Sequence, residues 1–597
     1  MNNKVIEVTN RLINKSKATR REFLKYSEEQ AKTGKNRTNL SCGNLAHAIA
    51  ACSQQDKSNF MNFTQANVAI VTSYNDMVSA HHPYQGYPTS IKKVLSTSGH
   101  TAQVAGGVPA MCDGITQGQS GMDLSLFSRD LIAQSTAISL SHNVYDATLL
   151  LGVCDKIAPG MLMGALSFAH LPTAFIPSGL MATGISNEEK VDVRQKFAAN
   201  KIGKDELLEM ECKSYHSAGT CTFYGTANTN QLVFEAMGLM LPGSAFTHPN
   251  SELRERLTDT ATRQIVSRTL GSPSYRPLYQ VITEKNIING VVALLASGGS
   301  TNHTIHMVAL AKSAGIELNW DDIDELSEVI PLLVNVYPNG QMDMNAFQSA
   351  GGVPALLKRL NEQSLLHQDV LTTFGNFESQ LTFPVIENDQ LLWKSSEGSL
   401  NPDVIAASGE VFSQTGGLKL LSGNLGRGVV KVSAVSEEHY EIEAPAVVFT
   451  SQHDVERAYK NGELTKDCVV VVTHNGPAAN GMPELHKLMP ILGNLQKSGY
   501  KIALLTDGRL SGASGKVPSV IHMSPEATRG GGVGLIRNED IIRINCHSGV
   551  VENLADMSNR HASTVDTEAA QKTWGRKLFE SARKNVSSAE DGASFIV

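Results

Sequence analysis

Residues 147–156 read ATLLLGVCDK, and they carry the clearest structural signal in the chain. The first seven form a short, continuous apolar run, which is typical of a strand buried on both faces of a parallel sheet. Ligands of open α/β sheets bind outside the carboxyl ends of such strands. Here a thiol, a carboxylate and an amine follow, at Cys154, Asp155 and Lys156. A soft ligand beside a hard one indicates an iron–sulfur site with a divalent cation, while a structural cysteine beside an ion pair fits these residues equally well.

The segments on either side of this strand alternate between strands and helices. We expect strands at residues 69–72 and 173–176, and a helix over 128–142 with Ser128 as its N-cap. Residues 1–65 are polar and predict helices, and residues 303–313 predict another. Short apolar strands that alternate with helices are typical of a layered α/β domain.

The C-terminal part of the chain is richer in strand signals. Runs of β-branched residues separated by turns occur at 428–432, 446–449, 468–472 and 501–505. A chain of 597 residues is too long for one hydrophobic core, and its sequence becomes irregular between residues 375 and 410. We therefore predict an α/β fold with a large layered domain over residues 1–385 and a smaller β-rich, barrel-like domain over 386–597.

Composition and charge exclude several classes of protein. The net charge is −7 and no basic stripe offsets it, which argues against nucleic-acid binding. No apolar run approaches the roughly 20 residues that cross a membrane, and no signal-peptide core is present near the N-terminus. The eight cysteines are scattered, as reduced thiols or metal ligands of a cytoplasmic protein would be. We expect a cytoplasmic protein with a small-molecule substrate, no nucleic-acid partner and no membrane contact.

Polar loops that contain glycine follow several predicted strands. They read GGVPAMCDG at residues 106–114, NGMPELH at 480–486 and TDGRLSG at 506–512, and GTCT at 219–222 adds a thiol before a predicted helix. The cysteines lack C-x-x-C spacing, which argues against structural zinc and leaves an iron–sulfur cluster with ligands from distant loops open. The phosphate-loop motif is absent, and the glycines of residues 423–428 have the wrong spacing for a dinucleotide fingerprint.

Two of these segments extend into long motifs. Residues 154–164, CDKIAPGMLMG, closely resemble the first signature of the dihydroxyacid/phosphogluconate dehydratase family, and residues 506–514, TDGRLSGAS, resemble its second. Residues 41–47, 73–82 and 219–230 resemble the phosphogluconate branch of that family. The resemblance covers nearly the whole chain. It implies a homodimeric hydro-lyase that converts 6-phospho-D-gluconate, a phosphorylated sugar acid, to 2-dehydro-3-deoxy-6-phospho-D-gluconate and water.

The resemblance also implies an iron–sulfur cluster that acts as a Lewis acid. By motif match, Cys154 and Cys221 would be cluster ligands. Relatives with a [2Fe-2S] cluster have a third cysteine where this chain has Ala80, and that departure favours a [4Fe-4S] cluster. Cys112 is our candidate for the third ligand because it adjoins Asp113 in another motif loop, and a buried structural thiol is the alternative.

A second metal site and the general base follow from the same resemblance. Asp113, Asp155 and Glu484 match positions that hold Mg²⁺ in dihydroxyacid dehydratases, and Lys156 matches a lysine that is carbamylated there. Carboxylate oxygens are the ligands that Mg²⁺ prefers, although loop-capping or ion-paired residues are the alternative reading of each position. Ser511 matches the residue assigned as the general base, for which a serine hydroxyl needs stabilisation by a metal.

The sequence offers several groups that can bind the phosphate. The Gly298–Asn302 turn opens a predicted helix and can present backbone N–H groups to an anion. Arg427, Arg509 and Lys516 can supply positive charge.

Two other functions stay open on the sequence. One is a dihydroxyacid dehydratase or another sugar-acid dehydratase, and the other is an iron-responsive binding protein without catalytic activity. Glu484 and Ser511 argue against the second, because a sensor needs no base.

Overall fold

A parallel sheet forms the centre of the N-terminal half. The computed structural model describes residues 1–512, 514–565 and 574–597, and in this part of the chain the sheet has the strand order β2 (Thr101–Gly107), β1 (Asn67–Thr72), β3 (Ala147–Leu151), β4 (Thr173–Phe175). Each neighbouring pair is parallel. The strand β3 is buried along its whole length, as its continuous apolar run predicts. The predicted strands of this half are confirmed, with β3 ending before Gly152.

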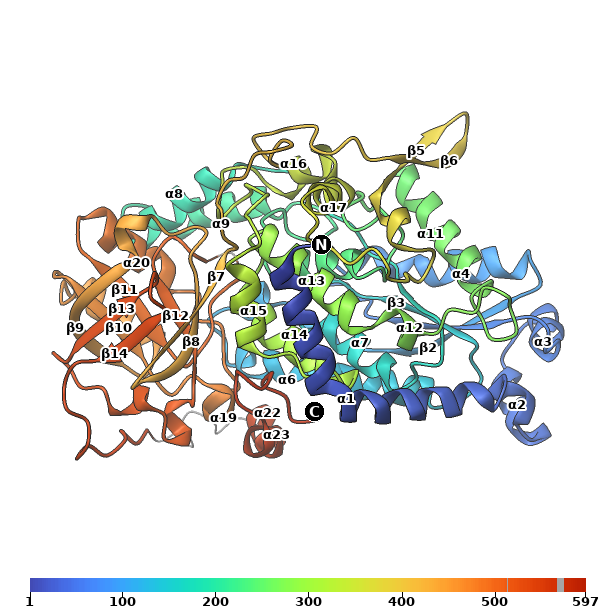
Figure 1. Cartoon of the computed structure of the whole chain (residues 1–597), viewed down its shortest axis with the longest axis horizontal. Coiled ribbons are helices and arrows are strands. Elements are labelled where there is room, and N and C mark those ends of the chain that lie inside the picture. The colour runs from blue at the N-terminus through green and yellow to red at the C-terminus, as the bar shows by residue number, and fades with distance from the viewer. Residues whose placement is uncertain (513, 566–573) are drawn as a thin grey trace.

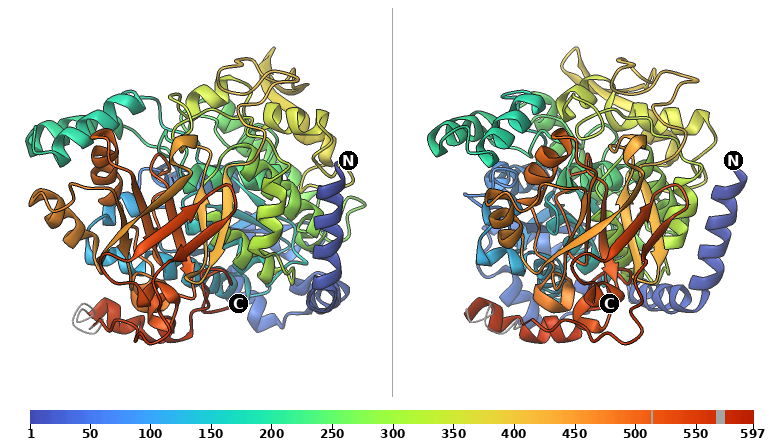
Figure 2. Two further views of the ribbon diagram at one scale, coloured as in Figure 1. Left: turned by 60° about the vertical axis from the view of Figure 1, so that its left-hand side comes forward. Right: turned by 90° about the vertical axis from the view of Figure 1, so that its left-hand side faces the viewer.

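Helices surround this sheet (Figure 1). Residues 1–65 are helical as predicted, and α1 runs along the outer edge of the molecule (Figure 2). The predicted helix over 303–313 is confirmed as α14. The helices of this half are α1 (Asn3–Lys32), α2 (Cys42–Ile49), α3 (Gln54–Met61), α4 (Tyr87–Ser96), α5 (Asp113–Thr116), α6 (Ser125–Leu140), α7 (Ile157–Leu166), α8 (Asn187–Ala198), α9 (Lys204–Ser214), α10 (Thr226–Ala236), α11 (Glu252–Val266), α12 (Leu278–Val281), α13 (Glu284–Ala296), α14 (His303–Ser313), α15 (Trp320–Ser327), α16 (Met344–Ser349) and α17 (Gly352–Glu362).

The predicted start of α6 was wrong. The helix begins at Ser125 rather than after Ser128, and Ser128 lies inside its first turn, where its hydroxyl donates to the Ser125 carbonyl at 2.6 Å. A 3-10 turn over Ser120–Leu124 leads directly into the helix. The chain therefore enters α6 already coiled, and no side chain caps its N-terminus.

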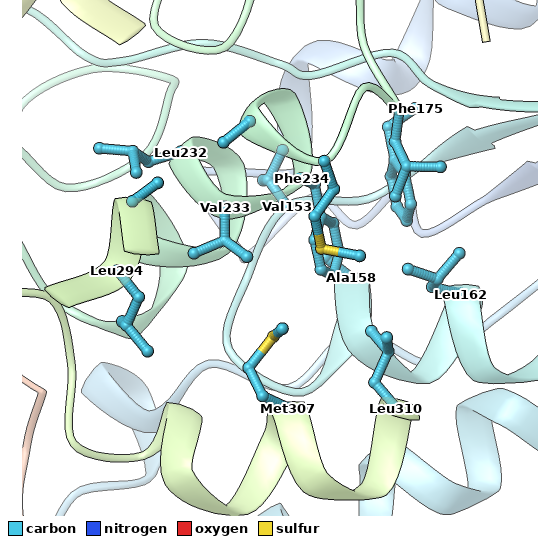
Figure 3. Packing of buried hydrophobic residues seen from close by; sticks show 14 of the residues in the cluster. Val153, Ala158, Leu162, Phe175, Leu232, Val233, Phe234, Leu294, Met307 and Leu310 are labelled. Atoms are coloured by element: carbon cyan, nitrogen blue, oxygen red, sulfur yellow. The ribbon is translucent and has the colours of Figure 1, made fainter. Parts of the chain in front are cut away.

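An apolar core supports the turn between β3 and α7. Val153 and Ala158 lie on either side of Cys154–Lys156 and are buried with Phe234 of α10 and Met307 of α14 (Figure 3). The helices α6 and α7 also approach closely, since a Cβ at Gly160 would lie 2.4 Å from the Arg129 carbonyl oxygen. Packing on both sides thus fixes where Cys154, Asp155 and Lys156 stand.

A closed barrel forms the C-terminal half (Figure 1). Within the described residues, its strands follow the order β10 (Cys468–Val472), β11 (Ile502–Thr506), β12 (Ser519–Ser524), β8 (Gly426–Lys431), β7 (Leu418–Gly423), β14 (Val550–Asn553), β13 (Ile541–Asn545), β9 (Glu441–Phe449). The strands β9 to β12 are parallel to one another, whereas β7 and β8 form an antiparallel pair. The interior holds small apolar side chains such as Val469, Val471 and Val520. The predicted barrel-like domain is confirmed.

Short helices join or flank the barrel strands, and the chain end returns to the N-terminal half. Arg129 of α6 donates to the Gly592 and Ala593 carbonyls at 3.0 and 2.9 Å. Among the described residues, no helix combines the length and the apolar character that crossing a bilayer requires. The helices of this half are α18 (Gln452–Lys460), α19 (Pro477–Asn480), α20 (Leu488–Lys497), α22 (Trp574–Leu578) and α23 (Glu580–Asn585).

The connection between the halves is more regular than its sequence suggests. The strands β5 (Thr382–Glu387) and β6 (Gln390–Ser395) form an antiparallel hairpin there. Asn388 and Asp389 at its tip both have positive φ, 50° and 62°, as the favoured two-residue hairpin turns require. The first barrel strand begins at Leu418. The domain boundary between residues 385 and 386 falls within β5 and stays a prediction.

Candidate active site

Loops that follow parallel strands of both halves meet at one place. In the N-terminal half, β2 is followed by Cys112 and Asp113, and β3 by Cys154–Lys156. In the barrel, β10 leads to the loop with Glu484, and β11 leads to the loop with Arg509 and Ser511. Both halves therefore contribute the carboxyl ends of parallel strands, which is where ligands of α/β sheets bind.

Carboxylates from three of these loops converge. Asp113, Asp155 and Glu484 each offer an oxygen, and the three oxygens lie within 4.8 Å of one another. Asp113 and Glu484 are buried and come from opposite halves of the molecule. Oxygen ligands in such a group fit a hard divalent cation.

Two cations hold these carboxylates together. The Lys156 ammonium contacts Asp113 and lies 3.3 Å from Asp155 Oδ2. The Arg509 guanidinium joins the halves, with Nη2 2.9 Å from Asp113 Oδ2 and Nη1 3.2 Å from Glu484 Oε2. The two cations thus balance two of the three carboxylates, which leaves one negative charge in excess.

Burial and charge set the protonation of this cluster. Burial alone would raise the pKa of Asp113, but Lys156 and Arg509 outweigh it and hold that pKa well below its usual range. Burial raises the pKa of Glu484 to about 7, and the nearby Asp113 charge adds to the effect. Burial likewise raises the pKa of Asp155, with Lys156 opposing it. Asp113 is therefore the fixed anion around which the other groups are arranged.

Three thiols lie next to the carboxylates. Burial raises the pKa of Cys154 well above its usual range, and the neighbouring Cys112, Asp155 and Cys221 raise it further. Burial raises the pKa of Cys221 to about 12, with Cys112 as its next cause. Cys112, Cys154 and Cys221 therefore lie near one another on three loops. Cys112 was included among the predicted ligands only because it adjoins Asp113. The structure thus brings the predicted thiol ligands close to the predicted carboxylate ligands. The roles of both sets as metal ligands stay predictions.

The loop that carries Ser511 packs against the N-terminal half. Asn302 Nδ2 donates to the Leu510 carbonyl at 3.3 Å, and a Cβ at Gly512 would lie only 2.4 Å from Ser300 Oγ. Glycine at 512 is therefore needed for this approach. Ser511 is half-buried and follows Arg509 by two residues. The predicted base is therefore close in sequence to the arginine that binds the carboxylate cluster.

Most of the predicted phosphate ligands are already engaged. The N–H groups of Gly298 and Gly299 donate to the Leu295 and Leu294 carbonyls within the turn. Arg427 is not at this site, because it pairs with Asp321 and Glu590 at 2.5 Å each.

Arg509 is committed to the carboxylates, whereas Lys516 is exposed. Its Nζ lies 5.9 Å from the centroid of the Tyr337 ring.

The structure places two residues outside the predicted ligand sets beside the thiol loops: His81, a histidine that the sequence offered without a role, and Lys190, which the sequence reasoning missed. His81 is fully buried, and its Nε2 accepts from the Cys154 N–H at 3.4 Å. Burial lowers the pKa of His81 to about 3, so it is a neutral acceptor that orients the thiol loop. Lys190 donates to Thr222 at 3.3 Å beside Cys221. His81 lies in the segment 73–82 that resembles the family, whereas Lys190 lies in no motif and is marked only by its burial beside a thiol loop.

Comparison with known proteins finds similar sequences over the whole chain. Residues 65–380 match the model of the dihydroxy-acid/6-phosphogluconate dehydratase N-terminal domain, and residues 403–593 match that of the C-terminal domain. The chain is 54% identical to the phosphogluconate dehydratase of Escherichia coli K12 over 601 aligned residues, which cover 100% of both chains. It is 52% identical to the phosphogluconate dehydratase of Pseudomonas aeruginosa, over 99% of this chain and 98% of the relative. A dihydroxy-acid dehydratase of Lachnoclostridium phytofermentans is 35% identical over 80% of this chain and 84% of its own.

Proposed function

The chain belongs to the dihydroxy-acid/6-phosphogluconate dehydratase family, and we propose that it converts 6-phospho-D-gluconate to 2-dehydro-3-deoxy-6-phospho-D-gluconate and water. The observation that carries this choice is the identity to proteins named phosphogluconate dehydratase, 54% and 52% over essentially the whole chain. The relative named dihydroxy-acid dehydratase is less similar and covers less of the chain. A cytoplasmic homodimer is part of the proposal, and the mass of the native protein in solution tests the dimer.

We assign Cys112, Cys154 and Cys221 as the ligands of a [4Fe-4S] cluster. The buried thiol of Cys154 and the partly buried thiols of Cys112 and Cys221 lie near one another on separate loops, and thiolates are the usual ligands of such clusters. When bound, the cluster supplies a Lewis acid that helps the 3-hydroxyl group of the substrate to leave. Three protein ligands would leave one of the four irons free for that task.

We assign Asp113, Asp155 and Glu484, with Lys156 beside them, to a Mg²⁺ ion. The support is the convergence of three carboxylate oxygens within 4.8 Å. When bound, the ion supplies positive charge that stabilises the enediolate formed as C2 loses its proton. Until then, Lys156 and Arg509 compensate the carboxylates.

The residues of the chain perform the proton transfer and hold the substrate. Ser511, acting as an alkoxide, takes the proton from C2 while the 3-hydroxyl leaves as hydroxide. The proton held by Ser511 then passes to the hydroxide to give water and restore the alkoxide. The enol loses the proton on its C2 oxygen and gains one at C3, which gives the 2-keto acid. Arg509 ties the loop of Ser511 to Asp113 and Glu484, which holds the base near the carboxylates.

Anaerobic purification followed by iron and sulfide analysis and keto-acid assays tests the proposal. We expect turnover of 6-phospho-D-gluconate, and turnover of only 2,3-dihydroxyisovalerate would assign the chain to the other branch. Replacing Ser511 with Ala should lower kcat by about 10²- to 10⁴-fold, the usual contribution of a general base. Ser514→Ala in the same loop is the matched control, and equal losses in both variants would remove Ser511 from its role.

A further inference from the structure

Lys431 is a buried lysine with no compensating charge among the described residues. It ends β8, where Val430 points into the barrel core and Val429 packs in the core cluster that extends into the N-terminal half. Because side chains alternate along a strand, Lys431 lies on the same face as Val429, toward the N-terminal half. It is 4% exposed, and its Nζ has no hydrogen-bond partner among the described residues. Burial lowers its pKa to about 7.

A charge in such a position needs an explanation. Burying an ammonium group without a partner is costly, so natural proteins pair buried lysines or use them. Two buried arginines of this chain follow that rule, since Arg37 pairs with Asp146 and Arg509 pairs with Asp113. The buried Lys190 has no ion pair among the described residues, but it donates to Thr222 Oγ1. Lys431 departs from the rule and is therefore a candidate for binding an anion that the protein does not itself contain.

A second lysine stands at the same place. A Cβ at Gly515 would lie 3.4 Å from Lys431 Cδ, so the backbone of the Ser511 loop covers the lysine stem. The next residue is Lys516, whose Nζ lies 5.9 Å from the Tyr337 ring. Neither lysine takes part in an ion pair within the part of the chain that the structure describes. Two lysines without an ion pair among the described residues thus lie at the Gly515 segment, Lys431 beneath its backbone and Lys516 next to it in the chain.

Polar groups close the other side of this place. Ser433 follows Lys431 by two residues and donates to Asn339 Oδ1 at 2.9 Å. The Asn339 amide nitrogen is buried and, among the described residues, has no acceptor. Asn339 belongs to the same loop as Tyr337, which returns to Lys516. These contacts surround one place between the halves. Two nitrogen donors there, Lys431 Nζ and Asn339 Nδ2, have no partner among the described residues.

The loop after β11 connects the two lysines to the site of the proposed reaction. The segment after β11 begins at Arg509 on the carboxylate cluster, continues through Ser511, and reaches Lys516 beside Lys431. A substrate whose carboxylate lies at the cluster and whose C2 faces Ser511 would extend its far end toward the two lysines. In a phosphorylated sugar acid, that end is a phosphate monoester.

We propose that Lys431 and Lys516 bind the phosphate monoester of the substrate, with Lys516 as the exposed contact and Lys431 as the buried one. The inference rests on the proposed function for the identity of the substrate. It makes these lysines the determinants of specificity between phosphorylated and unphosphorylated sugar acids. The turn at Gly298–Asn302 is a weaker choice, since several of its N–H groups are already bonded.

Binding measured without turnover tests the proposal. We would take the anaerobically prepared holoprotein carrying Ser511→Ala and titrate it by calorimetry with 6-phospho-D-gluconate, gluconate and inorganic phosphate. Adding Lys516→Met or Lys431→Met should weaken 6-phospho-D-gluconate binding by about 10- to 100-fold, the range for a hydrogen bond to a charged group. The affinity ratio of the phosphorylated to the unphosphorylated acid should fall with it, and inorganic phosphate binding should be lost.

Lys501→Met, a change of an exposed barrel lysine, is the control and should retain the parent ratio. A ratio that stays at the parent value in both Lys431→Met and Lys516→Met would overturn the inference. Equal weakening of both acids by Lys431→Met would remove Lys431 from the phosphate site. If the parent binds 6-phospho-D-gluconate through the lysines but the wild-type enzyme does not dehydrate it, the proposed function fails and the phosphate site stands.

Discussion

The two ends of the Ser511 loop treat buried charge in opposite ways. At the first end, Asp113 and Glu484 meet Arg509, and Lys156 adds a second cation. At the other end, Lys431 is buried with no partner among the described residues. The first end is compensated inside the protein, while the second leaves its charge for a ligand. The Ser511 loop thus joins two different sites. The carboxylate cluster holds the two halves together, whereas the site of Lys431 and Lys516 functions only when it binds an anion.

The difference has an energetic consequence. A buried ion pair is costly to break, because removing one partner leaves the other charge unpaired. The charge of an unpaired buried lysine already lowers the free energy of unfolding, so replacing that lysine with an apolar residue should raise it. Changes at the two ends should therefore move stability in opposite directions, although both should impair function.

The largest effect should come from the thiols beside the compensated end. Cys154→Ser or Cys221→Ser should abolish both the brown chromophore and the activity, because a serine hydroxyl is a poor ligand for iron in a sulfur cluster. Iron and sulfide analysis with the keto-acid assay measures this. Cys212→Ser, which changes an exposed cysteine, is the control. Cys112→Ser should behave like the first two, and a fully active, coloured Cys112→Ser protein would exclude Cys112 as the third ligand.

A smaller but still large effect should follow from breaking the compensated cluster. Asp113→Asn leaves Lys156 and Arg509 without their shared carboxylate and should destabilise the protein by about 3–5 kcal/mol. Urea unfolding in the presence of a chelator measures this apart from metal binding. Glu209→Gln, which breaks an exposed pair with Lys213, should have little effect on stability. Similar costs for the two variants would show that the buried cluster does not hold the halves together.

The fold could be predicted from the sequence where the signal is local. The strands β3 and β10 are continuous apolar runs, and their burial on both faces follows directly from that pattern. The start of α6 could not be predicted, because a preceding 3-10 turn replaces the cap that Ser128 was expected to provide. The hairpin of β5 and β6 was also missed, since its residues include a proline and several charges that obscure the strand pattern.

The site divides in the same way. Cys154, Asp155 and Lys156 are adjacent in the chain, so a single strand end was enough to propose them. The approach of Glu484 to Asp113 joins two halves of the molecule, and only the resemblance to a family predicted it.

Lys431 was missed because a lysine that ends a strand normally reaches solvent. Its burial depends on Gly515 and on packing against the other half, neither of which is visible in the sequence around it. Arg427 was considered for the phosphate because it can supply positive charge, yet acidic residues from elsewhere in the chain already pair with it.

The smallest expected effect is a gain of stability at the uncompensated end. Burial lowers the pKa of Lys431 from 10.5 to about 7 in the folded protein, so folding penalises the charged form. Below pH 7 both the folded and unfolded chains carry the proton, and the whole penalty applies. Between pH 7 and 10.5 the unfolded chain binds more protons than the folded one, so this group's contribution to stability rises with pH. Lys431→Met should therefore stabilise the ligand-free protein by about 1–3 kcal/mol at pH 6.

That gain should shrink as the pH approaches 9, because the wild-type lysine is then largely neutral in the folded state. Urea midpoints of Lys431→Met and wild type at pH 6 and pH 9, with Lys501→Met as the control, measure the difference. A loss of stability at pH 6 would mean that Lys431 is compensated by a partner in solution, and the contrast between the two ends of the loop would disappear. A gain at pH 6 that vanishes when wild type is saturated with phosphate would tie the cost of the buried lysine to the binding of its anion.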